Sequence, residues 1–357
     1  MKYSLIALFL FKILVAQAQK DSTKNHSSLK GLPFAFYTPD TRWGVGALGI
    51  LTFNFKNDTL NARKSNFSFG ASYTQLNQIL IGTPFQIFVD NANYWIYGEF
   101  GFYRYQYNLF GVGNRIPIDY IEKYQATYPR IRLNMLKKVM PNIYAGVRYT
   151  LDNFRYDKVE PNGFLAQQSI PGYFGGLVSG FAAVVNYDSR NSIFYPDKGF
   201  LIETYFHVEN KNTGSDFNYL RFSLDASHYR RLNKRMIQAF NFSFMSNSIG
   251  TPFHQMATLG GSKKLRGYYD GKYRDYRHAL LQTETRIIVY KRFGAAIFGG
   301  IGKVFKNADD IALNHIRWNI GAGLRYFIDE KQRIALRADL GFGIKSSGYY
   351  FTVSEAF

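Results

Sequence analysis

Residues 318–328 read Trp-Asn-Ile-Gly-Ala-Gly-Leu-Arg-Tyr-Phe-Ile, and this alternation decides the fold. One row holds the large or apolar residues Trp318, Ile320, Ala322, Leu324, Tyr326 and Ile328, and the opposing row holds Asn319, Gly321, Gly323 and Arg325. Successive side chains of a β-strand point to opposite faces of the sheet, so a period of two separates the two rows. The stretch therefore predicts a strand with one apolar face and one polar or small face.

The same period runs from residue 32 to the end of the chain, and in 333–342 it sets Arg337 and Asp339 against an apolar row. The predicted strands are 32–38, 42–55, 65–77, 79–90, 93–106, 121–137, 141–157, 173–187, 199–210, 216–231, 235–249, 278–291, 293–305, 314–328, 332–343 and 347–357. The count is fifteen unless 32–38 is a strand of its own. Because Pro39-Asp40 is a turn signal and single-chain bacterial barrels have an even number of strands, we expect sixteen.

The connections between these strands differ in length. Short turns are expected at 90–93, 137–142, 231–234 and 329–332, and longer polar or Gly/Pro-rich segments at 107–120, 158–172, 188–198, 250–277 and 306–313. Short turns on one side and long loops on the other are typical of outer-membrane barrels. We therefore predict an all-β fold over residues 32–357, a single 16-stranded antiparallel transmembrane β-barrel.

The first eighteen residues predict a signal peptide. Lys2 opens a basic region, an apolar run follows, and Ala16-Gln17-Ala18 gives the small-x-small pattern of a cleavage site. The alternative is a membrane anchor, but Lys12 interrupts the apolar run well short of the roughly twenty residues that a spanning helix needs. Residues 19–31 then form a short polar leader. No apolar run of about 18 residues follows, so the mature chain is expected to have no transmembrane helix.

Composition fits export to an outer membrane of a Gram-negative cell. Aromatic residues make up 18% of the chain, with 28 Tyr and 33 Phe, yet the mean hydropathy is −0.23. Aromatic girdles around a polar lumen have this composition. The formal net charge of +19 comes from single Lys and Arg residues scattered among aromatics, with no basic block. We expect a cationic lumen and loops near anionic lipid headgroups rather than a nucleic-acid partner.

No enzyme or cofactor site is expected. The chain has no Cys, and its six His residues lack metal-ligand spacing. Residues 44–49 match the pattern GxGxxG, but no helix pattern follows them, as a dinucleotide site would require. His228 with Ser227 or Asp225 leaves an enzyme as a weak alternative, although adjacent strand residues face opposite ways.

The long segment around 259–286 carries unusual features for a solvated loop. Gly260 and Gly261 precede the run Leu265-Arg266-Gly267-Tyr268, which suggests a loop that folds back on the protein. In the strand that follows, Gln282, Glu284 and Arg286 are expected to face the lumen, opposite a lipid-facing row. An Arg entering the lumen on this loop would meet Glu284, and a bidentate Arg–carboxylate bond in a partly dry site is strong and directional.

These residues resemble the BamA/TamA family of outer-membrane assembly and translocation barrels, also called bacterial surface antigens. The family motif [VIL]-R-G-[FY] on the sixth extracellular loop is matched by Leu265, Arg266, Gly267 and Tyr268. The sequence DSRNSIFYPDKGF at 188–200 is similar to another family turn, and 37–41 is similar to its first hairpin. The resemblance implies that Arg266 forms a clamp with Glu284 on the inner wall. A second family acid falls near Gly300, where this sequence has none.

The C-terminal segment 351–357 also resembles the family's last strand. A terminal aromatic is a feature that barrel-assembly machinery recognises in its substrates, so the resemblance implies this role for the last strand. In that strand Tyr349, Phe351, Val353 and Phe357 are expected to share one face, which Glu355 breaks.

Two functions follow as hypotheses. In the first, the barrel assists insertion or translocation of outer-membrane or surface proteins through a weak seam between 32–38 and 347–357, because the first strand is short and Pro33 cannot donate to the ladder. Its partners would be outer-membrane lipids, client proteins and a separate periplasmic protein, since the family's periplasmic delivery domains are not seen in the sequence. In the alternative, the chain is a passive channel or structural barrel.

Overall fold

The computed structural model of the protein describes residues 27–38, 42–55, 63–114, 116, 120–307, 314–330 and 333–357. The predicted signal peptide (1–18), the first part of the leader (19–26) and the Pro39-Asp40 turn lie outside the described residues.

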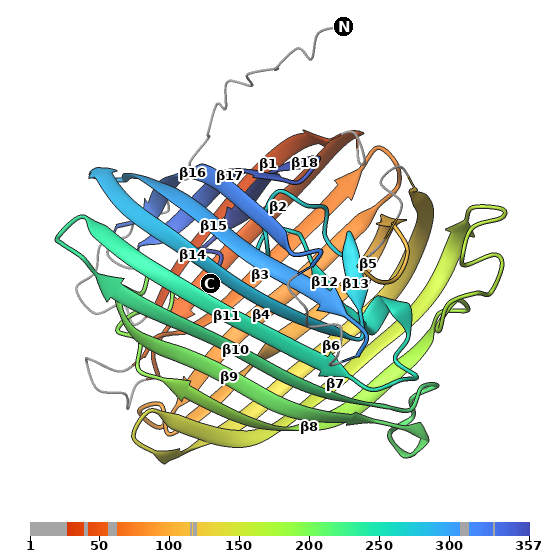
Figure 1. The fold of residues 1–357 in the computed structure, drawn as a ribbon. Coiled ribbons are helices and arrows are strands. Elements are labelled where there is room, and N and C mark those ends of the chain that lie inside the picture. The colour runs from red at the N-terminus through yellow and green to blue at the C-terminus, as the bar shows by residue number, and fades with distance from the viewer. Residues whose placement is uncertain are drawn as a thin grey trace, which may run out of the picture.

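The main sheet of the fold has sixteen antiparallel strands, and each pairs with the next strand of that sheet along the chain. These strands are β1 (Ser27–Thr38), β2 (Arg42–Phe53), β3 (Ser65–Thr74), β4 (Ile79–Val89), β5 (Tyr94–Leu109), β6 (Glu122–Met140), β7 (Ile143–Val159), β8 (Gly176–Asp188), β9 (Lys198–Glu209), β10 (Tyr219–Arg231), β11 (Met236–Asn247), β14 (Arg277–Tyr290), β15 (Phe293–Phe305), β16 (Arg317–Asp329), β17 (Ile334–Gly343) and β18 (Ser346–Val353). Figure 1 shows the sheet curled round so that β1 and β18 come side by side.

A second, two-stranded sheet lies within the connection between β11 and β14. It consists of β12 (Ala257–Leu259) and β13 (Tyr273–Asp275), preceded by the short 3-10 helix η2 (Phe253–Gln255). Figure 1 shows it inside the curled sheet. Another 3-10 helix, η1 (Lys211–Thr213), joins β9 to β10. Neither of these helices, within the described part of the chain, has the length or apolar character to cross a membrane.

The prediction of sixteen strands is confirmed, with two differences at the ends of the sheet. β1 begins at Ser27, five residues before the predicted start, and pairs with β2 along all twelve of its residues. The expectation of a short first strand is therefore wrong. At the other end, β18 stops at Val353 instead of continuing to Phe357. Ser354, which follows, has φ of 68°, and a left-handed residue at this point breaks the extended course.

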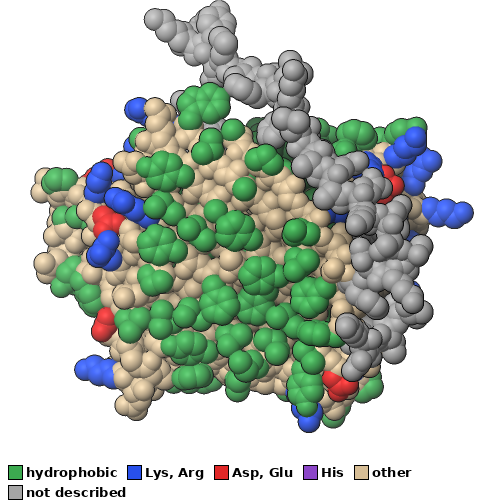
Figure 2. Space-filling view, turned by 180° about the vertical axis from the view of Figure 1, so that it is seen from behind, with side chains coloured by type: hydrophobic (Ala, Val, Ile, Leu, Met, Phe, Trp, Pro, Cys, Tyr) green, Lys and Arg blue, Asp and Glu red, His purple; other side chains and the backbone are tan. Residues whose placement is uncertain are grey.

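The alternation divides the sheet into two faces as expected. In β16, Ile320 and Leu324 are exposed on the outer face, whereas Asn319 and Arg325 are buried on the inner face. Figure 2 shows apolar side chains spread over the outside of the sheet, with most charged side chains near its two ends. The polar side chains of the inner face pack against one another and against the β11–β14 connection. The interior therefore contains more buried Arg and Glu residues than an ordinary protein core.

The long connections do not all lie at one end. Antiparallel pairing puts the ends of β5, β7, β11 and β15, where four of these connections begin, at the same end of the sheet. The connection β8–β9, predicted among the long loops as 188–198, instead lies at the end of the short turns. It is compact because the Asp188 carboxylate accepts bonds from Arg190 and Arg63, and the Asn191 side chain accepts bonds from the backbone N–H groups of Asp197 and Lys198.

Candidate functional site

The connection 248–276, here called the inner loop, carries the motif Leu265-Arg266-Gly267-Tyr268 into the interior of the curled sheet. Leu265, Arg266 and Tyr268 are almost completely buried. Leu265 and Tyr268 pack in an apolar cluster with Leu280 of β14 and Val304 of β15. The loop is therefore held against the inner wall by side chains of its own motif.

The Arg266 guanidinium bridges two carboxylates on different strands. Its Nη2 lies 2.6 Å from Glu284 Oε2 on β14, and its Nη1 lies 2.5 Å from Asp339 Oδ2 on β17. The guanidinium also lies over the Phe298 ring of β15, 3.4 Å from the ring centroid. All three charged side chains are at most 1% exposed, so each depends on the others for the interactions that water would otherwise supply.

Three more arginines and one more carboxylate extend this pair of contacts into a network. Glu284 Oε1 accepts a bond of 2.8 Å from Arg286 Nε, and Asp339 Oδ1 accepts one of 2.5 Å from Arg325 Nη1. The ion-pair network consists of Arg266, Glu284, Arg286, Arg325, Arg337, Asp339 and Glu355. Its four arginines face three carboxylates, and this near balance allows so many charges to stay buried.

The backbone of the motif approaches the wall closely. Gly267 has φ of 116°, and a Cβ atom there would come within 2.9 Å of the backbone at Gly341 and Phe342 of β17. The Gly267 N–H donates to Tyr350 Oη, and Tyr350 Oη donates in turn to the Tyr268 carbonyl. Only glycine combines this φ with this contact.

Gly260 and Gly261 shape the turn that precedes the motif. Gly260 has φ of 111°, and a Cβ atom there would lie 1.9 Å from the carbonyl oxygen of Tyr269. The Gly261 N–H donates to the Tyr268 carbonyl. The two glycines thus let the turn before the motif pack against the end of the motif.

The inner loop also reaches the opposite wall. Gln255 Nε2 donates to Asp152 of β7 at 3.0 Å, and the Gln255 carbonyl accepts a bond of 2.6 Å from Arg221 of β10. His254 Nδ1 lies 2.9 Å from Tyr156 Oη, also of β7. Arg266 binds β14 and β17, whereas Gln255 binds β7 and β10. The inner loop therefore contacts two separate parts of the inner wall.

The residues after β18 turn into the same network. Glu355 Oε2 lies 3.1 Å from Arg325 Nη2, and the Phe357 backbone oxygen accepts a bond of 2.7 Å from Arg286 Nη2. Phe357 therefore does not share the outward row of Phe351 and Val353, and that prediction is wrong. The arginines of the inner wall attract the Glu355 carboxylate inward once Ser354 has turned the chain.

The edges of the sheet meet without a ladder. Every neighbouring pair from β1 to β18 in the sheet order is hydrogen-bonded, but no pairing joins β1 to β18 among the described residues. An ion pair joins β1 to another strand: Lys30 of β1 lies 2.6 Å from Asp329, the last residue of β16. We call this junction of β1 and β18 the seam.

Comparison with known proteins identifies the family. Residues 51–328 match the Omp85 superfamily domain. The chain belongs to the Omp85 superfamily. Solved structures with a similar fold include BamA from Haemophilus ducreyi lacking POTRA domains 1–3, with 14% identity and a TM-score of 0.55, covering 96% of this chain and 74% of that one.

CdiB structures are also similar. CdiB from Acinetobacter baumannii has 13% identity and a TM-score of 0.56, covering 96% of this chain and 64% of that chain. CdiB from Escherichia coli has 9% identity and a TM-score of 0.60, covering 93% and 63%. The chain thus spans less than two thirds of each CdiB. A search of curated protein sequences finds no match.

The BamA/TamA resemblance puts a second clamp acid near Gly300, and the structure has a different arrangement. A Cβ atom at Gly300 would lie 2.8 Å from Gln282 Cβ, so the position has little room for a larger side chain. Asp339 supplies the second carboxylate from β17 instead. Sequence reasoning put Asp339 on the inner face but did not connect it with Arg266. The available signal was an acidic residue that alternates with apolar residues in a strand near the end of the chain.

The histidine and serine considered for catalysis are on opposite faces. His228 faces outward, with its ring centroid 4.3 Å from that of Phe200, whereas Ser227 is buried on the inner face and accepts a bond from Asn241. The described residues also contain no group of three or more His, Cys, Asp or Glu arranged to hold a metal ion.

Proposed function

We propose that this Omp85 chain is a transmembrane barrel of the Gram-negative outer membrane that assists insertion or translocation of outer-membrane or surface proteins through its seam. The observation that carries the proposal is that no backbone pairing joins β1 to β18 among the described residues. The other fifteen pairs of neighbouring strands in the sheet are all hydrogen-bonded. An opening there would require no backbone hydrogen bonds between the two strands to break.

Membrane placement is supported by the two faces of the sheet. Outward rows carry exposed apolar residues such as Val45, Ile320, Leu324 and Phe351, while charged residues line the interior. A surface of this kind is costly in water and favourable in lipid. The export signal predicted for residues 1–18 is consistent with this location.

A client strand could add at the seam by β-augmentation. Unpaired edge strands present a row of N–H and C=O groups that another strand can bind. β1 offers twelve residues to such a strand, whereas β18 has only eight. The weakness of the seam is thus attributed to the shorter β18 and to its inturned end, rather than to a short β1.

The proposal includes three kinds of partner. Outer-membrane lipids would contact the outward rows, client barrel or surface proteins would use the seam, and a separate periplasmic protein would deliver them. The ion-pair network would act as a structural clamp that holds the inner loop while the seam opens.

A passive channel is less well supported, because the inner loop contacts opposite walls of the lumen through Arg266 and Gln255. Planar-bilayer recording separates the two functions. We expect no stable, large conductance from the purified protein, and such a conductance would favour the channel.

Depletion of the protein in its native cell tests the proposed function. We expect the levels of other barrel proteins in the outer membrane, or of surface proteins, to fall, and to recover when the wild-type chain is supplied again. Unchanged levels of both would contradict the proposal.

A further inference from the structure

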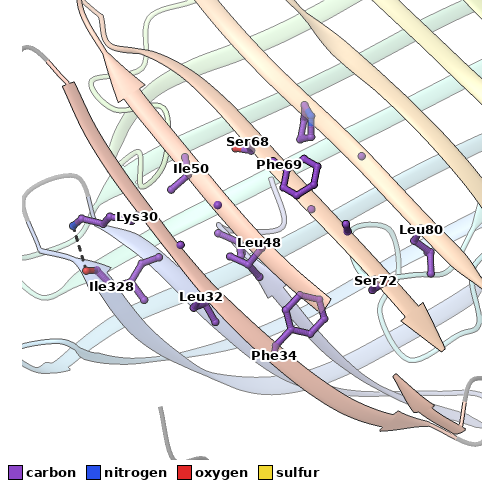
Figure 3. Close-up of a pocket in the computed structure, with 17 residues that line it drawn as sticks. Lys30, Leu32, Phe34, Leu48, Ile50, Ser68, Phe69, Ser72, Leu80 and Ile328 are labelled. Carbon is purple, nitrogen blue, oxygen red and sulfur yellow. Dashed lines mark hydrogen bonds between the residues drawn. The ribbon is translucent and has the colours of Figure 1, made fainter. Parts of the chain in front are cut away.

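An apolar cavity of about 370 Å³ lies beside the seam. Its wall is formed by side chains of β1–β4 together with one residue each from the ends of β16 and β18 (Figure 3). The apolar members are Leu32, Phe34, Leu48, Ile50, Leu80 and Val353. Pockets that hold small molecules have roughly 300–1,000 Å³, so the cavity is large enough for a ligand.

The residues that line the cavity belong to the inner face of β1 and to the outer face of β18, the two edge strands of the sheet. Leu29 is 75% exposed on the outside of β1. Because side chains alternate along a strand, Lys30 and Leu32 face inward. Val353 shares its row in β18 with Phe351, which is 77% exposed on the outside. One cavity that touches both rows therefore lies between the inner face of β1 and the outer face of β18. The end of β18 passes inside β1, consistent with the ion pair from Lys30 to Asp329.

The chain leaves this space unfilled because its inward rows are small across β3 and β4. Ser68, Gly70 and Ser72 line the cavity from β3, and Gly82 lines it from β4. A Cβ atom built on Gly70 would meet nothing closer than the Gly82 carbonyl oxygen, at 3.9 Å. The cavity could therefore hold a larger side chain at Gly70, and the protein does not supply one.

The lining favours a hydrocarbon occupant. Ser68 and Phe69 of β3 have no register partner in β4, but β2 and residues 70–72 of β3 pair with strands on both sides. A peptide placed there would leave its own N–H and C=O groups without partners, which is unfavourable in an apolar site. An acyl chain carries no polar groups to satisfy.

The source of that hydrocarbon follows from the position of the cavity. It adjoins the seam, where no ladder separates it from the apolar outer rows of β1 and β18. Lys30, whose side chain is 37% exposed and whose ammonium forms a 2.6 Å ion pair with Asp329, lies at its polar end. We infer that the cavity binds one acyl chain of a membrane phospholipid, which enters at the seam and leaves its headgroup near the Lys30–Asp329 ion pair. The inference goes beyond the proposed function: it rests on the membrane placement but on no client protein.

Photo-cross-linking in nanodiscs tests this inference. The probe is phosphatidylglycerol with a diazirine in its acyl chain, added to the purified full chain, and the labelled residues are mapped by mass spectrometry. We expect label on the inward residues Leu48, Ile50 and Leu80 in addition to outward residues such as Val45. Label confined to the outward rows would overturn the inference.

Matched variants add a second readout. Gly70→Leu fills the cavity and is expected to lower the inward label by about tenfold, because the added side chain occupies the space of the acyl chain. Ala47→Leu adds similar apolar bulk on the outer face of β2 and is expected to leave the inward label unchanged. Equal inward label in Gly70→Leu and wild type would contradict the inference. If Gly70→Leu does not assemble, Ser72→Leu takes its place.

A photoreactive strand peptide distinguishes the other occupant. Label of Leu48 and Ile50 by the peptide, without label by the lipid, would assign the cavity to a protein client and overturn the acyl-chain inference. Because none of these measurements uses client insertion, their outcome is independent of the depletion experiment on the proposed function.

Discussion

Arg266 of the inner loop and Asp339 of β17 are in direct contact, with Nη1 2.5 Å from Oδ2, although 73 residues separate them in the chain. The same guanidinium holds Glu284 of β14. The inner loop is therefore bonded to β14 and to β17, the two strands that flank β15 and β16. These four strands and the inner loop form one unit next to the seam.

Replacement of Arg266 by Ala is expected to loosen the inner loop. Glu284 and Asp339 would each lose a buried partner, and breaking a buried ion pair costs about 3–5 kcal/mol. Limited proteolysis measures the effect as faster cleavage within 250–277.

The control for this variant is Arg292→Ala, which removes an ion pair between two exposed side chains, Arg292 and Glu330. Such surface pairs contribute little, so the cleavage rate should stay near that of the wild type. If Arg266→Ala were cut no faster than Arg292→Ala, the clamp would not hold the loop.

Gly267→Ala is expected to displace the motif even though Arg266 is retained. The new Cβ atom would meet the β17 backbone at 2.9 Å in addition to the strain of a φ of 116°. Gly214→Ala is the matched comparison, because Gly214 has φ of 84° with nothing within 4 Å of a built Cβ. Thermal unfolding should show the larger loss of stability for Gly267→Ala, by about 1 kcal/mol or more. Equal losses would mean that the close approach at Gly341 is unimportant.

Glu355→Gln is expected to release the residues after β18. The neutral amide would no longer attract Arg325 and Arg286, so 354–357 should leave the interior more often. Amide hydrogen exchange of the 351–357 peptide measures this, and exchange should accelerate by about tenfold, the effect of a ~1.4 kcal/mol change in opening free energy. Unchanged exchange would show that Ser354 and the packing of Phe357, rather than the charge, set the course of the tail.

Acidification is expected to weaken docking of the inner loop near His254. Desolvation against Phe154, Phe217 and Phe253 lowers the pKa of His254 to about 3, with Arg274 and Arg221 acting in the same direction and Asp152 opposing them. An undocked loop would titrate near its ordinary pKa of about 6.5 and take up a proton that the docked loop cannot. Stability of docking is therefore full above about pH 6.5 and falls as the pH decreases toward the docked pKa.

Comparison of His254→Gln with the wild type isolates this effect. Cleavage of the inner loop by a protease active at both pH 7.5 and pH 5 should accelerate on acidification in the wild type and less so in the variant. The same acceleration in both proteins would assign the pH dependence to other groups.

The strands could be predicted because their signal is local. In β16 the outer row from Trp318 to Leu324 and the inner Arg325 follow directly from alternation, and the contact of Arg266 with Glu284 was expected from the family motif and the register of β14. The partner Asp339 could not be assigned in this way. Arg266 reaches β17 across the curve of the sheet, and this distance depends on how the sheet bends rather than on spacing in the chain.

The two ends of the sheet show the same limit. Ser27–Gly31 read as a polar leader, yet these residues extend β1 because β2 offers them a pairing edge. The alternation of Phe351 and Val353 predicted a strand to the last residue, but the left-handed turn at Ser354 and the arginines of the interior redirect it. In both cases tertiary partners outweigh the local pattern.

A reversible cross-link across the seam tests the central proposal most directly. The chain has no Cys, so Leu32→Cys with Val353→Cys, two positions that line one cavity, places one thiol on β1 and one on β18, and mass spectrometry verifies the disulfide between them. Leu32→Cys with Leu48→Cys is the control, because these residues are register partners in the β1–β2 ladder. The measurement is recovery of other outer-membrane barrel or surface proteins in cells depleted of the native protein. We predict that the oxidised seam variant does not restore the levels of these proteins, that reductant restores its function, and that the oxidised control restores them. Full function of the cross-linked seam variant would contradict the account.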